Sequence, residues 1–402
     1  MKKGIFVIIM GIIVLSIVAF AVDQQPEKVR LYVKARDTIG MKSLSDLDLR
    51  HQFAHGVVSV EMSSTAAEQL AQNPHFEVVG EATLWSLTAP PSSCSPWPAC
   101  KGGSAPAQRI FFPADQTPWG IEVVYNNPAL TATNGGAGVN VAVLDTGATI
   151  NHLDLTRRVV QCKDFTKRKL SNGCTDENGH GTHTAGTVAA DAGNDSQGIY
   201  GVAPNANLFI YKVCGTQFCW SDDVAAAINY AANQGADIIS MSLGGSSLAT
   251  IEKNAIDYAV ANDVLVIAAA GNSGPNVDTI NYPAAYEKVV AVAALDSSLS
   301  VTSWSSRGSN DGDSVIEERE VEIALPGAAV ESTWNDGGYR VISGTSMATP
   351  HASGLAARHW QGSAALTRTW LQTRAALLDI TAGQYAAAGD DPASGLGLPT
   401  VE

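Results

Sequence analysis

The segment ADIISMSLGGSSLATIEKNAIDYAVANDVLVIAAAGNSG, from Ala236 to Gly274, gives the clearest indication of how the chain folds. It contains two near-continuous apolar runs, ADIISMSLGG and DVLVIAAAGNSG, and such runs are typical of strands buried on both faces of a parallel sheet. Between them, TIEKNAIDYAVAND (250–263) has the spacing of an amphipathic helix. This succession of strand, helix and strand predicts a right-handed crossover between parallel strands.

The same pattern recurs on both sides of this segment. Further apolar runs are VNVAVLDTG (139–147), ANLFIYKVC (206–214) and VVAVAALD (289–296), and DDVAAAINYAANQG (222–235) has helical spacing. Residues 110–402 are therefore predicted to form an α/β domain with a doubly wound, mostly parallel sheet and helices on both faces. In that architecture ligands bind at the carboxyl ends of the strands.

The N-terminus has the pattern of a secretory signal peptide. Two lysines precede an apolar run (5–18), which is followed by the A-x-A sequence AFA (19–21). We expect residues 1–21 to be cleaved and the protein to be secreted into the extracellular medium, with no stable membrane association. An uncleaved anchor is the alternative, because the run from 4 to 22 is nearly long enough to span a bilayer, but the small residues at its end favour cleavage.

Between the signal peptide and the α/β domain the pattern is different. Residues 22–90 contain strand-like alternation in VRLYVKAR, GVVSVEMS and FEVVGEATLWSL, and helical spacing in TAAEQLAQ. They predict a small α+β domain of ferredoxin-like type. Residues 91–109 are rich in Pro, Ser, Gly and Ala and are expected to be a linker or an N-terminal extension of the following domain.

Charge and cysteine content limit the partners and the compartment. The formal net charge of −14 and the lack of clustered Lys and Arg argue against a nucleic-acid-binding protein. Six cysteines fit an oxidising compartment. They fall into three close pairs, which are Cys94 with Cys100, Cys162 with Cys174, and Cys214 with Cys219. Proximity favours disulfides between these neighbours, although six cysteines permit 15 connectivities, and unpaired buried thiols are the alternative.

Three polar side chains are predicted at the ends of buried elements. Asp145 ends the strand in VNVAVLDTG, His180 begins an apolar helix in ENGHGTHTAG, and Ser346 begins another in VISGTSMATPHASG. Nucleophilic catalysis needs such a set, because an imidazole must take the proton of the hydroxyl and a carboxylate must orient the imidazole. The alternative for Ser346 is a helix cap. Asn272 follows another strand, where its amide is placed to donate to an oxyanion or to form a turn.

Four segments in this order, VLDTG, GHGTHTAG, AAGNSG and GTSMATPHASG, resemble the subtilisin-like serine proteases (subtilases) from about Pro118 to the C-terminal region. The resemblance implies a subtilisin-like α/β fold with Asp145, His180 and Ser346 as the catalytic triad and Asn272 as the oxyanion donor. It also implies a serine endopeptidase that hydrolyses proteins through an acyl-enzyme with broad specificity. The small first domain would be a propeptide that inhibits the enzyme, assists its folding and is removed by autoprocessing.

The resemblance extends to the substrate-binding groove. One wall of the groove would be a strand that pairs with the substrate backbone. The matching residues are Ser242, Leu243, Gly244 and Gly245 on this wall, Ala269 and Gly271 on the opposite wall, and Asn281 at the pocket floor, where many relatives have glycine.

By the same resemblance the chain is expected to bind Ca²⁺ as a structural ion. The family often uses an Asp or Gln near the N-terminus, an Asp after the catalytic one and a loop that follows the His helix. The matching positions are Asp115, Asp154 and Asp195, and oxygen ligands of this kind suit calcium. Aspartates in surface turns are the alternative. His183 and His351 are expected to be structural.

Two other functions remain open at this point. One is a catalytically inactive relative that serves as a binding or inhibitory module, and the other is an enzyme that hydrolyses small esters. All four polar positions of the site are filled, which argues against the first. The expected partners are protein substrates and the chain's own propeptide, and the mature protein is expected to be a monomer.

Overall fold

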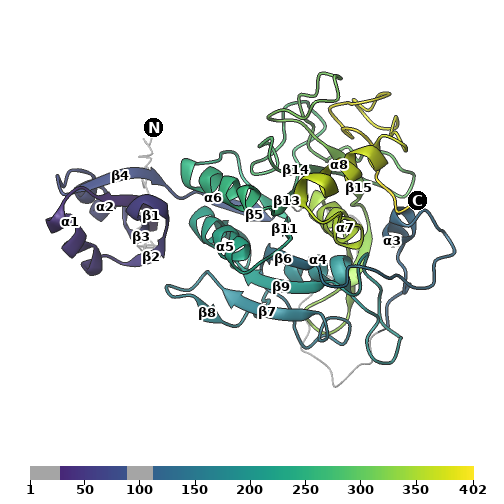
Figure 1. The fold of residues 1–402 in the computed structure, drawn as a ribbon, viewed down its shortest axis with the longest axis horizontal. Helices are drawn as coiled ribbons and strands as arrows, with labels where there is room; N and C mark the ends of the chain where they lie inside the picture. Colours follow the sequence, from purple (N-terminus) through teal and green to yellow (C-terminus); the bar gives the residue numbers. More distant parts are fainter. Residues whose placement is uncertain (1–27, 88–111) are drawn as a thin grey trace, which may run out of the picture.

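The computed structural model describes residues 28–87 and 112–402, which form a small and a large unit (Figure 1). The predicted signal peptide, the predicted linker and the pair Cys94 and Cys100 lie outside the described residues. Within the described ranges, no helix has the length and apolarity needed to cross a bilayer.

Residues 28–87, here called the N-terminal unit, contain an antiparallel sheet with the strand order β2-β3-β1-β4. Its elements are β1 (Lys28–Ala35), α1 (Thr38–Ser43), β2 (Leu49–Gln52), β3 (Val57–Ser63), α2 (Ser64–Ala71), β4 (Phe76–Glu81) and β5 (Leu84–Leu87). Successive side chains of β1 face opposite sides of the sheet. Leu31 and Val33 pack with Leu70 of α2, whereas Tyr32 packs with Val57 on the other face.

Residues 112–402, here called the α/β domain, are built around a sheet of eight strands in the order β15-β14-β13-β11-β6-β9-β7-β8. The strands are β6 (Asn140–Asp145), β7 (Val159–Asp164), β8 (Ser171–Asn172), β9 (Asn207–Lys212), β11 (Ile238–Met241), β13 (Leu265–Ala269), β14 (Val290–Leu295) and β15 (Ile323–Pro326). All neighbours are parallel except β7 and β8. The predicted doubly wound, mostly parallel sheet is confirmed.

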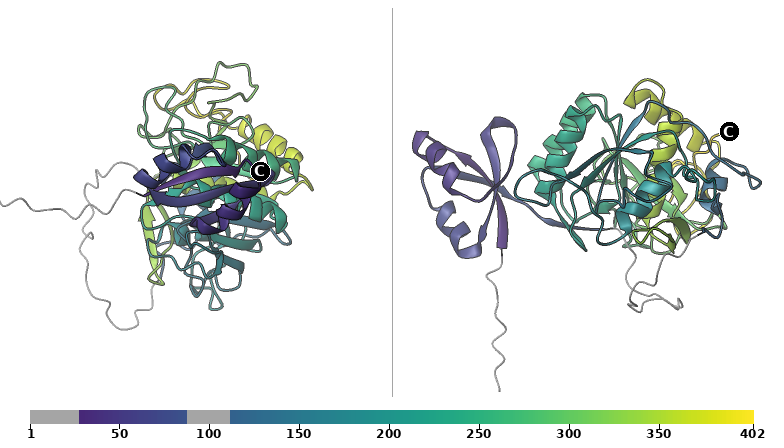
Figure 2. Two further views of the ribbon diagram at one scale, coloured as in Figure 1. Left: turned by 90° about the vertical axis from the view of Figure 1, so that its left-hand side faces the viewer. Right: turned by 90° about the horizontal axis from the view of Figure 1, so that it is seen from below.

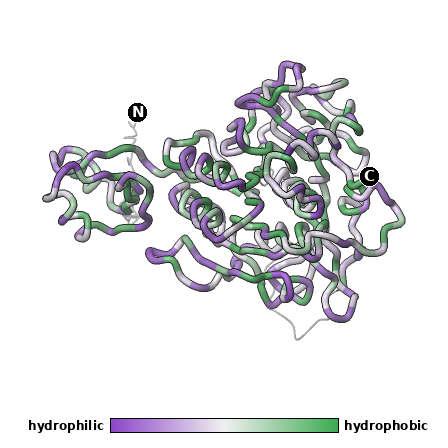
Figure 3. Tube along the Cα trace, in the orientation of Figure 1, coloured by the Kyte–Doolittle hydropathy of each residue, from purple (hydrophilic) through white to green (hydrophobic). Residues whose placement is uncertain are grey.

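Helices cover both faces of this sheet. They are α3 (Trp119–Val124), α4 (His180–Ala189), α5 (Ser221–Asn233), α6 (Thr250–Ala261), α7 (Thr345–Arg358) and α8 (Ala364–Ala375), and a separate hairpin consists of β16 (Val330–Thr333) and β17 (Tyr339–Ile342). In Figure 1, α5 and α6 lie between the sheet and the N-terminal unit, and α4 and α7 lie on the opposite side. Hydrophobic residues follow the central strands, and hydrophilic residues are frequent in the outer loops (Figure 3).

The last strand of the N-terminal unit belongs to a different sheet from the first four. β5 pairs antiparallel with β10 (Phe218–Trp220) on one side and with β12 (Leu243–Gly244) on the other. Figure 2 shows this segment running from the N-terminal unit to the α/β domain. The sequence predicted a single strand over residues 76–87, but the structure divides it, because β4 joins the first sheet and β5 joins the second.

Two of the three predicted cysteine pairs are disulfides. Cys162 is bonded to Cys174, and Cys214 is bonded to Cys219. The second bridge connects β10 to the segment that follows β9, so it lies beside the strand that contacts β5.

Candidate active site

Three elements bring the predicted triad residues to one region. Asp145 is the last residue of β6, His180 is the first residue of α4, and Ser346 lies in the first turn of α7. The helices α4 and α7 pack against each other. The turn before α4 requires glycine, because Gly179 has a φ of 104° and a Cβ there would lie 2.3 Å from the ring of Trp334.

The Asp145 carboxylate is buried and fixes the His180 ring. The His180 Nδ1 atom lies 2.8 Å from Asp145 Oδ1 and 3.0 Å from Oδ2. The Thr146 backbone N–H also donates to Asp145 Oδ1, at 2.7 Å, and the Thr184 hydroxyl donates to Oδ2, at 3.4 Å. A carboxylate buried with these donors has the hydrogen bonds that its charge requires.

The opposite nitrogen of His180 is the proton-accepting one. Because Nδ1 donates to Asp145, the lone pair of the neutral ring is on Nε2. This atom is buried and makes no hydrogen bond with the residues that the structure describes. Burial opposes the charged imidazolium, but the charge of Asp145 and its hydrogen bond outweigh burial, so the pKa of His180 lies above its ordinary value.

Ser346 is fully buried, and its hydroxyl does not cap its own helix. The N-cap position of α7 is Gly344, which makes no side-chain cap. The Ser346 hydroxyl donates to the Ser242 carbonyl at 3.1 Å, and the Ser242 hydroxyl donates to the Ser346 carbonyl at 2.7 Å. The hydroxyl therefore lies beside the residue that precedes β12.

Asn272 is hydrogen-bonded to Thr345, the residue that precedes Ser346. Its side-chain oxygen accepts hydrogen bonds from the Thr345 backbone N–H at 3.0 Å and from the Thr345 hydroxyl at 3.2 Å. Its amide nitrogen is buried and has no hydrogen-bond partner in the described parts of the chain. The site thus holds a hydrogen-bond donor that is available to a negatively charged oxygen.

The predicted groove contains a strand of the N-terminal unit. Leu87 of β5 is paired with Leu243 of β12, and Ser86 is paired with Gly244. On its other edge β5 is paired with β10. The segment β5 is therefore an extended peptide that is held between two strands of the α/β domain. The opposite predicted wall includes Ala269, the last residue of β13, which is parallel to β11 in the large sheet.

Small residues leave room for the side chains in this groove. Trp85 of β5 is 1% exposed and packs on Gly245, where a Cβ would lie 2.4 Å from the indole ring. A Cβ on Gly244 would lie 3.2 Å from Asn281, and one on Gly271 would lie 2.9 Å from the same side chain. Asn281 therefore lies between the two predicted walls.

The predicted calcium ligand Asp154 is buried at the centre of a loop. Its Oδ2 accepts hydrogen bonds from the Ile199 backbone N–H and the Tyr339 hydroxyl, both at 2.9 Å. Its Oδ1 has no partner among the described residues, and it would meet a Cβ on Gly198 at 1.9 Å. Burial raises the pKa of Asp154. Asp195 lies in the loop after α4 that supplies Ile199, and its Oδ1 accepts from the Gln197 backbone N–H.

The N-terminal residue that reaches this loop is Gln116, which the sequence pattern did not single out. Its side-chain amide contacts the Ser196 carbonyl at 2.7 Å and the Gly198 carbonyl at 3.1 Å. Asp115 instead accepts a hydrogen bond from the Thr117 backbone N–H, at 3.1 Å. The family preference for Asp or Gln near the N-terminus could have indicated Gln116, but Asp115 satisfies the same preference.

The remaining buried histidines are held by backbone carbonyls. His183 Nε2 contacts the carbonyls of Val330 at 3.0 Å and Arg340 at 3.1 Å, and His351 Nδ1 contacts the Met347 carbonyl at 2.7 Å. Burial lowers the pKa of His183 to about 3 and that of His351 to about 4. Both rings are therefore neutral and structural.

Comparisons with known proteins indicate the family of the chain. A family profile described as "Subtilase family" matches residues 136–397. A protein named "Subtilisin" from Bacillus sp. (strain TA39) is 43% identical over 398 residues, which cover 94% of this chain and 91% of the relative. Two solved structures, "Sphericase" and "S41 Psychrophilic Protease", are each 50% identical and cover 72% of this chain and all of theirs, with TM-scores of 0.71 and 0.70.

Proposed function

The chain belongs to the subtilase family of serine endopeptidases, and we propose that it is a secreted, broad-specificity protease that matures from an inhibited precursor. The proposed triad is Asp145, His180 and Ser346. The observation that carries this assignment is the buried His180 ring, which donates to Asp145 and presents an unpaired Nε2 on its other side.

These residues support acyl transfer to Ser346. The Ser346 oxygen attacks the carbonyl carbon of the scissile peptide bond, and its proton passes to His180 Nε2. The Asp145 carboxylate holds the ring and stabilises the imidazolium. The Asn272 amide donates to the oxyanion, and the protonated His180 gives its proton to the leaving amine. Water then hydrolyses the acyl-enzyme with His180 again acting as the base.

Main-chain pairing supports the proposal of broad specificity. A peptide that adopts the position of β5 bonds through its backbone to β10 and β12, and this pairing is independent of its side chains. Selectivity then depends on the pockets, of which the one filled by Trp85 is large and apolar. Proteins and peptides with a large apolar residue in that position are the proposed substrates.

The N-terminal unit is proposed to be the propeptide, within residues 22–90. Its strand β5 lies between β10 and β12, antiparallel to both, and so blocks access to the predicted groove. Leu87 is paired with Leu243. The residue before Leu243 is Ser242, whose carbonyl accepts a hydrogen bond from the Ser346 hydroxyl. We propose that maturation occurs at the Thr88–Ala89 bond, one residue beyond the end of β5, and that the signal peptide in residues 1–21 is removed during export.

The loop around Asp154 fits a structural calcium ion. It combines a buried, unpaired carboxylate oxygen with nearby carbonyl groups, and calcium prefers such oxygen ligands. We propose Asp154, Asp195 and Gln116 as side chains that hold the ion, the last through its amide oxygen. The ion would offset the charge of Asp154 and stiffen the loop without taking part in catalysis.

The decisive experiment uses an active-site probe. Purified mature protein should react with a fluorophosphonate, and the precursor of the variant Ser346→Ala should neither react nor mature, because the hydroxyl is the nucleophile in both reactions. Absence of labelling in the mature wild type would favour an inactive binding module. Turnover of nitrophenyl esters without clearing of casein would favour an esterase.

Removal of calcium should lower the unfolding temperature. At saturating calcium, the ion contributes about 3 kcal/mol, which corresponds to roughly 5 °C for a domain of this size. Asp154→Asn should abolish the effect of a chelator. Asp115→Asn preserves the turn with Thr117 and should keep the effect. An unchanged unfolding temperature in excess chelator would remove the calcium proposal.

A further inference from the structure

The α/β domain binds the guanidinium of an arginine that it does not itself supply. Arg30 of β1 contacts Asp222 Oδ1 at 2.8 Å and Asp223 Oδ2 at 2.9 Å through the same Nη1 atom. Its guanidinium also stacks over the ring of Trp220, 4.6 Å from the ring centre. An aromatic face and two carboxylates together form a site for this planar cation.

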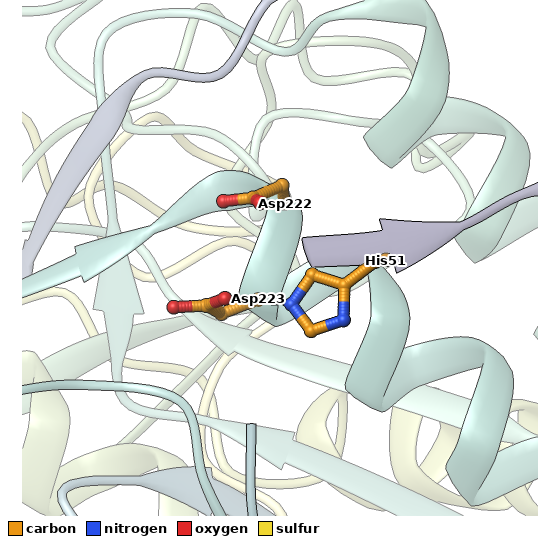
Figure 4. Close-up of side chains that lie close together, drawn as sticks. All are labelled: His51, Asp222 and Asp223. Carbon is orange, nitrogen blue, oxygen red and sulfur yellow. Dashed lines mark hydrogen bonds and ion pairs between the residues drawn. The ribbon is translucent and has the colours of Figure 1, made fainter. Parts of the chain in front are cut away.

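Other groups of the N-terminal unit complete the cover over the same carboxylates. Asp223 Oδ1 accepts a hydrogen bond from Arg50 at 3.0 Å and contacts His51 Nε2 at 2.7 Å. Burial raises the pKa of this carboxyl, but the hydrogen bond with His51 and the charges of Arg30 and Arg50 outweigh burial, so the pKa of Asp223 lies below its ordinary value. Asp222 Oδ2 accepts from the Ser59 hydroxyl at 2.8 Å. Figure 4 shows the His51 ring facing Asp223, with Asp222 beside it on the same helix.

A metal ion is the weaker interpretation of this cluster. His51, Asp222 and Asp223 have a spacing that suits one. However, two arginines already balance the two carboxylates, and a divalent ion would have to displace or face them. The groups that actually occupy the site are guanidinium groups.

Removal of the propeptide leaves the site on the mature enzyme without its cations. Asp222, Asp223 and Trp220 all belong to the α/β domain, whereas Arg30, Arg50, His51 and Ser59 belong to the N-terminal unit. The two carboxylates, which are at most 1% exposed in the precursor, then face solvent in the first turn of α5. The N-terminus of a helix favours their negative charge.

The path of β5 leads directly to this site. Before β5, Thr83 and Ser221 exchange two hydrogen bonds, at 2.9 and 3.0 Å. One residue earlier, the Ala82 backbone N–H donates to the Arg30 carbonyl at 2.8 Å, and the buried Ala82 side chain packs in a cluster with Trp220. A bound substrate that follows this path places the side chain at the position of Ala82 beside Trp220 and the carboxylates.

We propose that Trp220, Asp222 and Asp223 form a second binding site on the mature enzyme, which recognises an arginine of the substrate well upstream of the cleaved bond. With cleavage after Thr88, the recognised residue is the seventh before the cut, at the position of Ala82. This inference rests on the proposed protease function. The site would increase the affinity for extended basic segments and would leave the chemistry at Ser346 unchanged.

The test uses peptides copied from the chain itself. The parent peptide is GEATLWSLTAP (80–90), and two variants of it carry Ala82→Arg or Ala82→Glu; a shorter peptide, LWSLTAP (84–90), ends before the site. Cleavage by mature wild-type enzyme is measured as kcat and KM, and mass spectrometry locates the cut. At low salt the Ala82→Arg peptide should have a kcat/KM about fivefold above that of the parent, through KM, and the Ala82→Glu peptide should fall below the parent.

Salt and enzyme variants identify the groups responsible. The arginine preference should shrink in about 1 M NaCl, because exposed charges are screened. The ratio of kcat/KM for the Ala82→Arg peptide to that for the parent peptide should approach 1 in enzyme that carries both Asp222→Asn and Asp223→Asn. Asp311→Asn, which removes an exposed carboxylate that contacts Asp313 and not this cluster, should keep the preference. If the double variant fails to mature, the salt dependence of the wild type decides the question.

Two results would overturn the proposal in distinguishable ways. Equal kcat/KM values for the parent, Ala82→Arg and Ala82→Glu peptides, with the shorter peptide cleaved normally, would remove the second site and leave the protease function standing. Failure to cleave any of the four peptides would remove both. A preference that persists in the double variant would assign it to other residues and reject this site.

Discussion

Asn272 holds a buried amide nitrogen that has no hydrogen bond to any described residue, although its side-chain oxygen is tied to Thr345 twice. Leaving a buried donor unpaired costs about 1–3 kcal/mol. A fold retains such a group where a ligand satisfies it, and the oxyanion of the transition state would do so beside Ser346.

Replacing Asn272 should therefore affect the chemical step. In Asn272→Ala, kcat should fall by about 10²–10³-fold with little change in KM, since the donor acts only when the oxyanion forms. Steady-state kinetics on a short peptide would measure this. Ser273→Ala alters an exposed neighbour and is the control. A loss of less than about tenfold would show that the amide does not stabilise the oxyanion.

At the scale of elements, β5 connects inhibition to substrate recognition. Its residues alternate, so Trp85 is buried in the groove while Ser86 is exposed. Burial of an indole in a pocket of the partner surface is the kind of contact that dominates interface energies. The strand therefore contributes both backbone pairing and one large apolar anchor.

Truncating this anchor should speed the release of the propeptide. After autoprocessing, the complex of Trp85→Ala should dissociate at least about 30-fold faster than that of wild type, because an interface hot spot is worth about 2 kcal/mol or more. The appearance of activity after dilution measures this rate. Ser86→Ala should behave as wild type, and equal rates for Trp85→Ala and wild type would show that backbone pairing alone holds the strand.

The division between β4 and β5 shows where sequence patterns reach their limit. The run from 76 to 87 predicts one strand, yet its buried residues pack in three different clusters: Phe76 with Leu31 and Val33, Ala82 with Tyr32 on the other face of that sheet, and Trp85 in the core of the α/β domain. Periodicity reports which side is buried but not against which element. Prediction of the second sheet requires the positions of β10 and β12 in the α/β domain, which the sequence of residues 76–87 does not contain.

The same reasoning explains which site residues the sequence could indicate. Asp145 and Asn272 were indicated because they follow buried strands, and His180 and Ser346 because they begin apolar helices. In a parallel sheet with helical crossovers such positions gather at the carboxyl edge of the strands. Gln116 and the guanidinium site at Asp222 depend on contacts between segments that are far apart in the chain, here Gln116 with Gly198 and Asp222 with Arg30. No local pattern encodes such contacts.

For the molecule as a whole, the buried histidines connect pH to stability. His183 and His351 are fully buried with backbone partners, and burial lowers their pKa values to about 3 and about 4. In the unfolded chain a histidine has a pKa of about 6.5. Below that pH the unfolded chain binds protons that the folded protein refuses, so the free energy of unfolding falls as the pH decreases from about 6.5 toward 4.

Replacing one of these histidines should flatten the acid side of the stability profile. Within that window each buried ring lowers the free energy of unfolding by about 1.4 kcal/mol per pH unit. The unfolding temperature of His351→Gln should therefore fall less than that of its parent between about pH 6.5 and pH 4.5, even if the variant is less stable at neutral pH. The Ser346→Ala chain is the background, because it avoids autolysis. His55→Asn changes an exposed histidine with a positive φ that asparagine tolerates, and it should retain the parental slope. Parallel slopes for His351→Gln and its parent would mean that the folded protein accepts the proton on this ring, and the neutral, structural assignment of His351 would then be wrong.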